Sequence, residues 1–201
     1  MKGKQPKNWP VVLEYANSIR EGRKVACEEL RQAVARFFRD LEDPAYWMDH
    51  KAPEFCIGVI ERTLCHQQGE RLDGTPMRGR PFLLEPFHKF IIYNLVGFKL
   101  AGTDVVRFHE ALIYIPRKNI KTSFAASLAW ALSLLYRRSG SKMYIASAAL
   151  MQSMESYNFL AYNIRRMGED VKSGGPVRIV DNHNEHSISA DLGDGSLYIR
   201  A

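Results

Sequence analysis

The chain lacks the features that mark disulfide-rich, zinc-ribbon and membrane proteins. Its 201 residues hold only three cysteines, Cys27, Cys56 and Cys65, an odd number with no C-x-x-C spacing. We therefore expect neither a disulfide framework nor a zinc ribbon, and we interpret these cysteines as reduced core thiols of a cytosolic protein. The longest apolar stretch, residues 124–135, is too short to cross a bilayer, and no secretory signal follows the basic, polar start. No membrane partner is expected.

The composition is that of a folded protein with a modest excess of positive charge. Hydrophobic residues make up 46% of the chain and charged residues 25%, so disorder is not the default expectation. The formal net charge of +6 points toward a polyanionic partner. A lysine-rich start and solvated helix faces explain the same charge equally well, so charge alone decides nothing.

The first 80 residues read as a helical region that ends in a loop. Apolar residues recur at three- and four-residue steps between Leu30 and Leu41, as one buried helix face requires. A second helix is predicted over residues 53–64, and residues 67–81, rich in Gly, Arg and Pro, are predicted to form a loop. Residues 87–98 are predicted to be helical again.

From residue 111 onward the pattern changes to alternating strands and helices. Residues 111–115, Ala-Leu-Ile-Tyr-Ile, predict a buried strand, and residues 142–146 a second one. Helices are predicted over 121–135 and 150–167. This order implies a parallel sheet with right-handed crossovers. Three short alternating runs close the chain, at 177–180, 187–192 and 196–200, with a hairpin signal at 193–195.

A candidate phosphate-binding loop lies where the first strand should meet its helix. The amides of a helix N-terminus attract anions, a lysine there can reach β- and γ-phosphates, and the next hydroxyl can ligate Mg²⁺. Lys121 and Thr122 stand in that order, and only this Lys-Ser/Thr pair follows a predicted strand. The candidate nucleotide-binding residues of the loop are Arg117, Lys118, Asn119, Ile120, Lys121, Thr122 and Ser123. A basic, solvated helix cap is the alternative.

The loop departs from the G-x-x-x-x-G-K-[ST] pattern (Walker A) at both glycine positions, which Ile115 and Ile120 occupy. If residue 120 must take a glycine-like conformation, a β-branched side chain costs roughly 1–3 kcal/mol. A charge-assisted contact from Lys121 contributes a comparable amount, roughly 1.5–3 kcal/mol. The two contributions are therefore comparable, and weak nucleotide binding stays open as an alternative to tight binding.

The loop resembles the R-K-N-G-K-[ST] loop of large terminase subunits, the DNA-packaging motors of tailed bacteriophages. The likeness extends over most of the chain. Residues 82–90 resemble the family's L-x-P-W-Q-k-f segment, and Gly97-Phe98 its following G-W or G-F. Further similar elements are Arg107-Phe108 with 111–116, residues 146–148 with Gln152, Tyr15 with Gly22, and residues 59–69.

The resemblance implies a fold and a set of roles. The fold is an α/β P-loop NTPase of the RecA/ASCE type, a parallel sheet with flanking helices, incomplete, and preceded by an N-terminal helical region (1–80, then 81–201). Lys121 would hold the phosphates of ATP, Thr122 the Mg²⁺, and Arg117 would stabilise the transferred phosphoryl group, so Arg117 and Lys121 are the catalytic candidates. Phe87-His88 replaces the family's Trp-Gln, whose glutamine resembles an adenine-reading group.

Other candidate residues are weaker. Asp181 follows an apolar run like a Mg²⁺-binding aspartate, but Asn182 stands where a glutamate is needed. His183 and His186 lack further ligands at a metal-site spacing, so loop histidines are the preferred interpretation. No apolar strand ending in Asp-Glu and no nuclease carboxylate cluster occurs before Ala201. We therefore expect the front part of a longer protein, without the carboxylates that ATP hydrolysis needs, whose parent is an ATPase and, by resemblance, an endonuclease.

The resulting hypothesis is the N-terminal part of an ATP-driven packaging motor in the cytoplasm of a bacterial host. By resemblance its partners are double-stranded DNA, a portal protein and a small terminase subunit, and the parent forms a homo-oligomer. Two alternatives remain open: a non-catalytic prophage remnant, and a different P-loop enzyme such as a helicase-like translocase.

Overall fold

The computed structural model describes residues 6–71, 73–116 and 119–201 and divides the chain into two compact units. The first unit comprises residues 1–57 and 84–114, and the second comprises residues 58–83 and 115–201. Each unit therefore contains residues from both sides of the boundary predicted at residue 80. The helix α3 (Lys51–Thr63) contributes its first half to one unit and its second half to the other.

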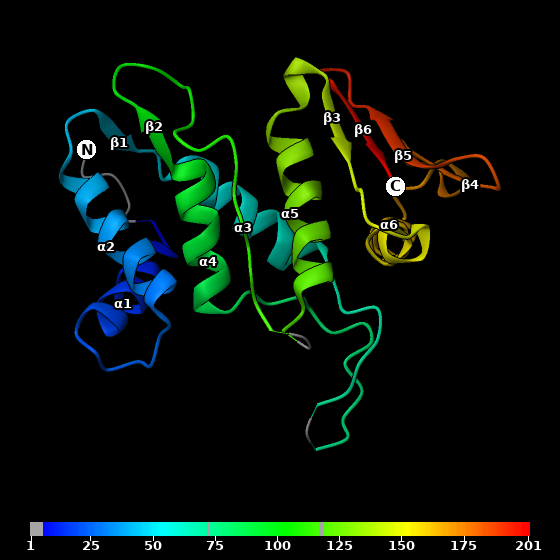
Figure 1. The fold of residues 1–201 in the computed structure, drawn as a ribbon. Coiled ribbons are helices and arrows are strands. Elements are labelled where there is room, and N and C mark those ends of the chain that lie inside the picture. Colours follow the sequence, from blue (N-terminus) through cyan, green and yellow to red (C-terminus); the bar gives the residue numbers. More distant parts are fainter. Residues whose placement is uncertain (1–5, 72, 117–118) are drawn as a thin grey trace. The chain divides into compact units, whose positions relative to one another are not determined.

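The first unit is mainly helical and has an aromatic core. It contains the helices α1 (Trp9–Arg20), α2 (Glu28–Glu42) and α4 (Pro86–Ile92), the π-helix η1 (Tyr93–Gly97), and the antiparallel strands β1 (Tyr46–Met48) and β2 (Phe98–Leu100) (Figure 1). Phe37 of α2 is fully buried, with its ring centroid 5.2 Å from that of Phe90 and 5.7 Å from that of Phe98. The helical periodicity between Leu30 and Leu41 thus predicted a real buried face.

The helical segment predicted over residues 87–98 is present over residues 86–97, as α4 followed by the π-helix η1. After Ile92 the backbone widens into the π-helix, and Phe98 already belongs to β2, which pairs with β1. The amide of Asp49 donates to the carbonyl of Gly97 at 2.8 Å, and a Cβ atom at residue 97 would lie 2.7 Å from the Met48 sulfur. Cross-strand pairing with β1 and close approach at Gly97 therefore end the helical segment at this residue.

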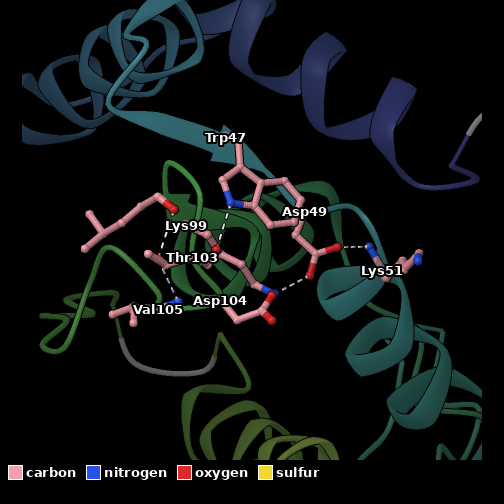
Figure 2. A network of polar contacts seen from close by, with 8 residues as sticks. Trp47, Asp49, Lys51, Lys99, Thr103, Asp104 and Val105 are labelled. Atoms are coloured by element: carbon pink, nitrogen blue, oxygen red, sulfur yellow. Dashed lines mark hydrogen bonds and ion pairs between the residues drawn. The ribbon is translucent and has the colours of Figure 1, made fainter.

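Ion pairs connect β2 and the residues after it to other elements of the first unit. Lys99 Nζ lies 2.8 Å from Asp49 Oδ2 and 3.1 Å from the exposed Asp104 (Figure 2). The other oxygen of Asp49 accepts a hydrogen bond from the Lys51 amide at 2.8 Å, at the start of α3. Arg107 in turn pairs with the buried Asp40 of α2, and its guanidinium carbon lies 4.0 Å from the centroid of the Tyr46 ring. These contacts link β1, β2, α2 and α3 within the first unit.

The second unit is an α/β layer structure. Its four-stranded sheet has the order β3-β6-β5-β4, formed by Ser141–Tyr144, Ser196–Arg200, His186–Asp191 and Val177–Asp181 (Figure 1). The helices α5 (Lys121–Leu135) and α6 (Leu150–Met167) pack against each other, α5 also against β3 and β6, and α6 against β5. Short 3₁₀ turns, η2 (Arg137–Ser139) and η3 (Val171–Ser173), follow the two helices.

The sheet is mixed, whereas the sequence predicted a parallel one. Strands β3 and β6 are parallel, but β5 is antiparallel to both of its neighbours, β6 and β4. The hairpin signal at residues 193–195 is confirmed, because it joins β5 to β6. The α/β character and the flanking helices are confirmed as well.

The strand predicted at residues 111–115 is absent. These residues have no regular secondary structure and pair with none of the described strands, and Leu112 and Tyr114 are each 93% exposed. An apolar run becomes a strand only where a neighbouring strand satisfies its backbone groups. The local pattern could not show whether such a neighbour exists.

The cysteines are all unpaired, but only two are core residues. Cys56 and Cys65 are buried, and burial raises the pKa of the Cys56 thiol to about 12. Cys27 is exposed at the residue before α2, so its predicted place in the core is wrong. It precedes the first helical turn, where a side chain faces solvent rather than the helix's apolar stripe.

The ion pair of Asp49 generates a prediction about pH. Burial by itself raises the pKa of Asp49, but the hydrogen bond and charge of Lys99 together with hydrogen bonds from backbone amides outweigh it, so the pKa is lowered. The stabilisation is therefore complete above the ordinary aspartate pKa of about 3.9 and disappears as the pH falls through the lowered value. We expect Asp49→Asn to lower the free energy of unfolding by about 2 kcal/mol at pH 7, and this difference to shrink below about pH 4.

Urea denaturation followed by circular dichroism at pH 7 and pH 3 would measure this difference. Asp104→Asn is the matched control, because Asp104 contacts the same ammonium while its side chain is 93% exposed; it should change stability by less than about 0.5 kcal/mol. A pH-independent loss in Asp49→Asn, or an equal loss in the control, would contradict the assignment.

Candidate functional site

The backbone turns left-handed immediately before α5. Ile120 has φ 56° and ψ 20°, and it is the only residue other than glycine with positive φ in the described part of the chain. L-residues with a Cβ atom disfavour this region, by about 1–2 kcal/mol. The glycine-like conformation considered for residue 120 is thus adopted, with isoleucine in place.

This turn leaves the amides at the start of α5 open to an anion. The amide of Phe124 donates to the Ile120 carbonyl at 2.8 Å, which closes the first helical turn. The amides of residues 121–123 therefore have no acceptor inside the helix. No side chain caps this N-terminus, and no acidic residue lies in its first turn. Partial positive charge is concentrated there without a side-chain acceptor at the cap.

Lys121 is the first residue of α5 and its side chain is exposed. Thr122 and Ser123 follow in the first turn and are half-buried; the carbonyl of Ser123 accepts a hydrogen bond from Ser127 Oγ at 2.6 Å. A lysine at this position opposes the helix dipole, so local electrostatics give it no stabilising role in the absence of an anion. The same geometry suits a phosphate group held by the amides and the ammonium together.

Only part of the remaining candidate loop belongs to the described residues. Asn119 is described, with Nδ2 3.3 Å from the Pro116 carbonyl oxygen, whereas Arg117 and Lys118 lie outside the described residues. The roles expected of Arg117 and Lys118 therefore stay predictions. The structure brings Ile120, Lys121, Thr122 and Ser123 together at one helix N-terminus.

Phe87 and His88 lie in the first unit, whereas the loop from residue 119 lies in the second. His88 is 1% exposed, and its Nδ1 accepts a hydrogen bond from the Glu85 amide at 3.2 Å in a capping box at the start of α4. Burial lowers the pKa of His88 to about 4, so its ring is neutral at pH 7. His88 thus caps α4, and the nucleotide-binding role that the resemblance implies for Phe87 and His88 stays a prediction.

The weaker metal candidates form a small polar cluster at the β4–β5 turn. His186 Nδ1 lies 3.0 Å from Asp181 Oδ1, and Arg165 of α6 lies 3.9 Å from the other oxygen of Asp181. In the described part of the chain, no group of three or more His, Cys, Asp or Glu side chains could hold a metal ion. Nor does any described helix have the length and apolar character needed to cross a membrane.

The second unit contains a hollow beside α6 that the sequence did not predict. This hollow of about 410 Å³ is lined by Gln67, Asn158, Tyr162, Arg165 and Arg166. From the sequence, residues 67–81 were predicted only as a loop. Arg165 and Arg166 were expected only as cations at a helix end. The i, i+4, i+7, i+8 spacing on α6 marks one helix face, but it does not reveal that Gln67 lies against it.

Comparison with known proteins adds no relative: no family model, curated protein or solved structure matches this chain.

The positive φ of Ile120 predicts a preference for glycine over alanine that is larger than at an ordinary N-cap. Residue 120 is the N-cap of α5, a position where glycine is already favoured over alanine. The Cβ penalty at positive φ adds about 1–2 kcal/mol for alanine, so we expect Ile120→Gly to be more stable than Ile120→Ala by more than about 1 kcal/mol. Thermal and urea unfolding would measure the free energy of unfolding of the two variants. Both variants lack the isoleucine side chain, so its loss does not contribute to the difference between them. Higher stability of Ile120→Ala would show that residue 120 is not left-handed in solution.

Proposed function

We propose that the N-terminus of α5, with the loop that leads into it, binds the phosphate groups of Mg-ATP. The observation that carries this proposal is the left-handed Ile120 immediately before an exposed lysine at an uncapped helix start. A solvated helix cap, the alternative interpretation, requires neither a strained residue nor a lysine at the positive end of the helix dipole.

Each residue has a role set by its chemistry. The open amides of residues 121–123 and the ammonium of Lys121 would contact the β- and γ-phosphates, and the hydroxyl of Thr122 would ligate Mg²⁺. Arg117 would neutralise charge on the transferred phosphoryl group. Mg²⁺ supplies additional neutralisation when bound. Carboxylates for hydrolysis are not assigned, so the proposed activity of these residues is nucleotide binding.

We further propose that this site belongs to the ATPase part of a DNA-packaging motor like the large terminase subunits. Its support is the ordered resemblance described above, from residues 82–90 through the loop to Gln152. In that setting the partners are double-stranded DNA, a portal protein, a small terminase subunit and further copies of the same chain, in the cytoplasm of a bacterial host.

The phosphate contact of Lys121 can be tested by titration with Mg-ATP. We expect Lys121→Ala to weaken binding about tenfold or more, because one charge-assisted contact is lost. Lys172→Ala is the matched control, since Lys172 also precedes a serine but lies in the short turn η3, where only its backbone amide bonds to Asp170. Isothermal calorimetry would measure both. Equal affinity of the wild type and Lys121→Ala would refute the proposed role of Lys121.

The magnesium contact of Thr122 has a separate signature. We expect Mg²⁺ to strengthen ATP binding to the wild type and to Thr122→Ser, which keeps the hydroxyl, but to have little effect on Thr122→Ala. ATP affinities measured with Mg²⁺ and with a chelator would give this ratio. A magnesium enhancement that persists in Thr122→Ala would assign the ion to another group.

A further inference from the structure

The hollow beside α6 has a lining suited to an anion and a flat ring. Four of its five lining residues, Asn158, Tyr162, Arg165 and Arg166, come from one face of α6, and Gln67 comes from the segment after α3. No carboxylate lines it. The lining therefore offers two guanidinium groups, two side-chain amides and one aromatic ring.

A buried contact from α6 holds the segment just before Gln67 in place. Asn163 is fully buried; its Oδ1 accepts from the Cys65 amide at 2.7 Å, and its Nδ2 donates to the Cys65 carbonyl at 3.1 Å. The base of the loop is closed by the His66 amide, which donates to the Arg80 carbonyl at 2.9 Å, and by the Phe82 ring, whose centroid lies 5.6 Å from that of Phe159. Gln67, two residues after Cys65, is thus fixed beside the helix before any ligand arrives.

The charges around the hollow are predominantly positive. The guanidinium carbon of Arg78, from the same loop, lies 5.6 Å from the centroid of the Tyr162 ring. Arg165 is 3.9 Å from Asp181, but both side chains are about half exposed, so water and salt weaken this pair. Glu155 and Glu169 are the nearest carboxylates along the chain before and after the four lining residues of α6, and neither lines the hollow.

The helix dipole explains arginines in the last turn of α6, but not their combination with an aromatic ring and two amides in one hollow. Guanidinium groups bind phosphate through paired hydrogen bonds, tyrosine rings stack on nucleobases, and amides read base edges. A duplex offers phosphates, but its bases stack on each other and their faces are closed to a protein ring. A single strand offers both groups at once.

We propose that this hollow binds single-stranded nucleic acid, with phosphates at Arg165 and Arg166, an unpaired base against Tyr162, and the amides of Gln67 and Asn158 at the base edge. Nothing in this site depends on Lys121 or on the proposed binding of Mg-ATP. The strand is recognised by its backbone charge and its stacking faces, so sequence preference should be slight.

Fluorescence anisotropy with a labelled oligothymidylate of about 16 nucleotides would test the site. We expect Arg165→Ala/Arg166→Ala to weaken binding about tenfold or more at low salt and to reduce its dependence on salt. Tyr162→Ala should weaken binding about tenfold, whereas Tyr162→Phe, which keeps the ring, should stay within about threefold of the wild type. Arg138→Ala/Arg178→Ala, which removes the same charge from exposed residues elsewhere in the second unit, should have a smaller effect.

Competition identifies the ligand class. Unlabelled single strand should displace the probe, and duplex of the same sequence or free ATP should do so at least about tenfold less well. Equal competition by duplex, equal competition by ATP, or equal losses in the two double-arginine variants would overturn the proposal. Lys121→Ala should leave oligonucleotide binding unchanged, and Arg165→Ala/Arg166→Ala should leave Mg-ATP binding unchanged. Failure of either site can therefore be told apart from failure of the other.

Discussion

The left-handed backbone at Ile120 must be held by the packing of the helix that follows it. Strain of about 1–2 kcal/mol persists only where surrounding contacts are worth more. In α5, Phe124, Ala126, Leu128, Trp130 and Ala131 are buried against the second unit's sheet and α6. Burial of one large apolar side chain contributes about 1.5–3 kcal/mol, so the helix core exceeds the strain several times over. The register of α5 in that core fixes where the chain must turn, and residue 120 adopts the conformation this position requires.

If packing imposes the turn at Ile120, the strain affects the stability of the fold rather than the affinity for nucleotide. If Ile120 became left-handed only on binding, its strain would weaken nucleotide affinity, as the sequence pattern suggested. Because the packing of α5 imposes the turn, the strain lowers the stability of the fold and leaves affinity largely unaffected. The open amides at residues 121–123 then form an anion site that needs little rearrangement. An isoleucine at a position where the G-x-x-x-x-G-K-[ST] pattern has glycine is therefore compatible with phosphate binding.

The parts of the fold that the sequence predicted correctly are those that neighbours in the chain determine. The bounds of α5 and α6 and the β5–β6 hairpin follow from periodicity and turn residues. The strand expected at residues 111–115 failed because a strand needs a partner that periodicity cannot supply. The hydrogen bond between Asn163 and Cys65 joins residues 98 positions apart. Neither residue type, nor its neighbours in the chain, indicates such a contact. The candidate loop could thus be located from local chemistry, whereas the hollow beside α6 depends on a long-range contact and could not.

The two sites of the second unit use opposite ends of two packed helices, and this affects how each binds an anion. At the N-terminus of α5 the helix dipole and open amides attract phosphate before any side chain contributes. Near the C-terminus of α6 the dipole repels it, so Arg165 and Arg166 must first offset that field. An anion beside α6 is therefore held by exposed side chains, whose attraction is screened by salt. Stacking on Tyr162 is not screened, and it is the contribution that makes a nucleic-acid strand a better ligand for this hollow than a bare phosphate.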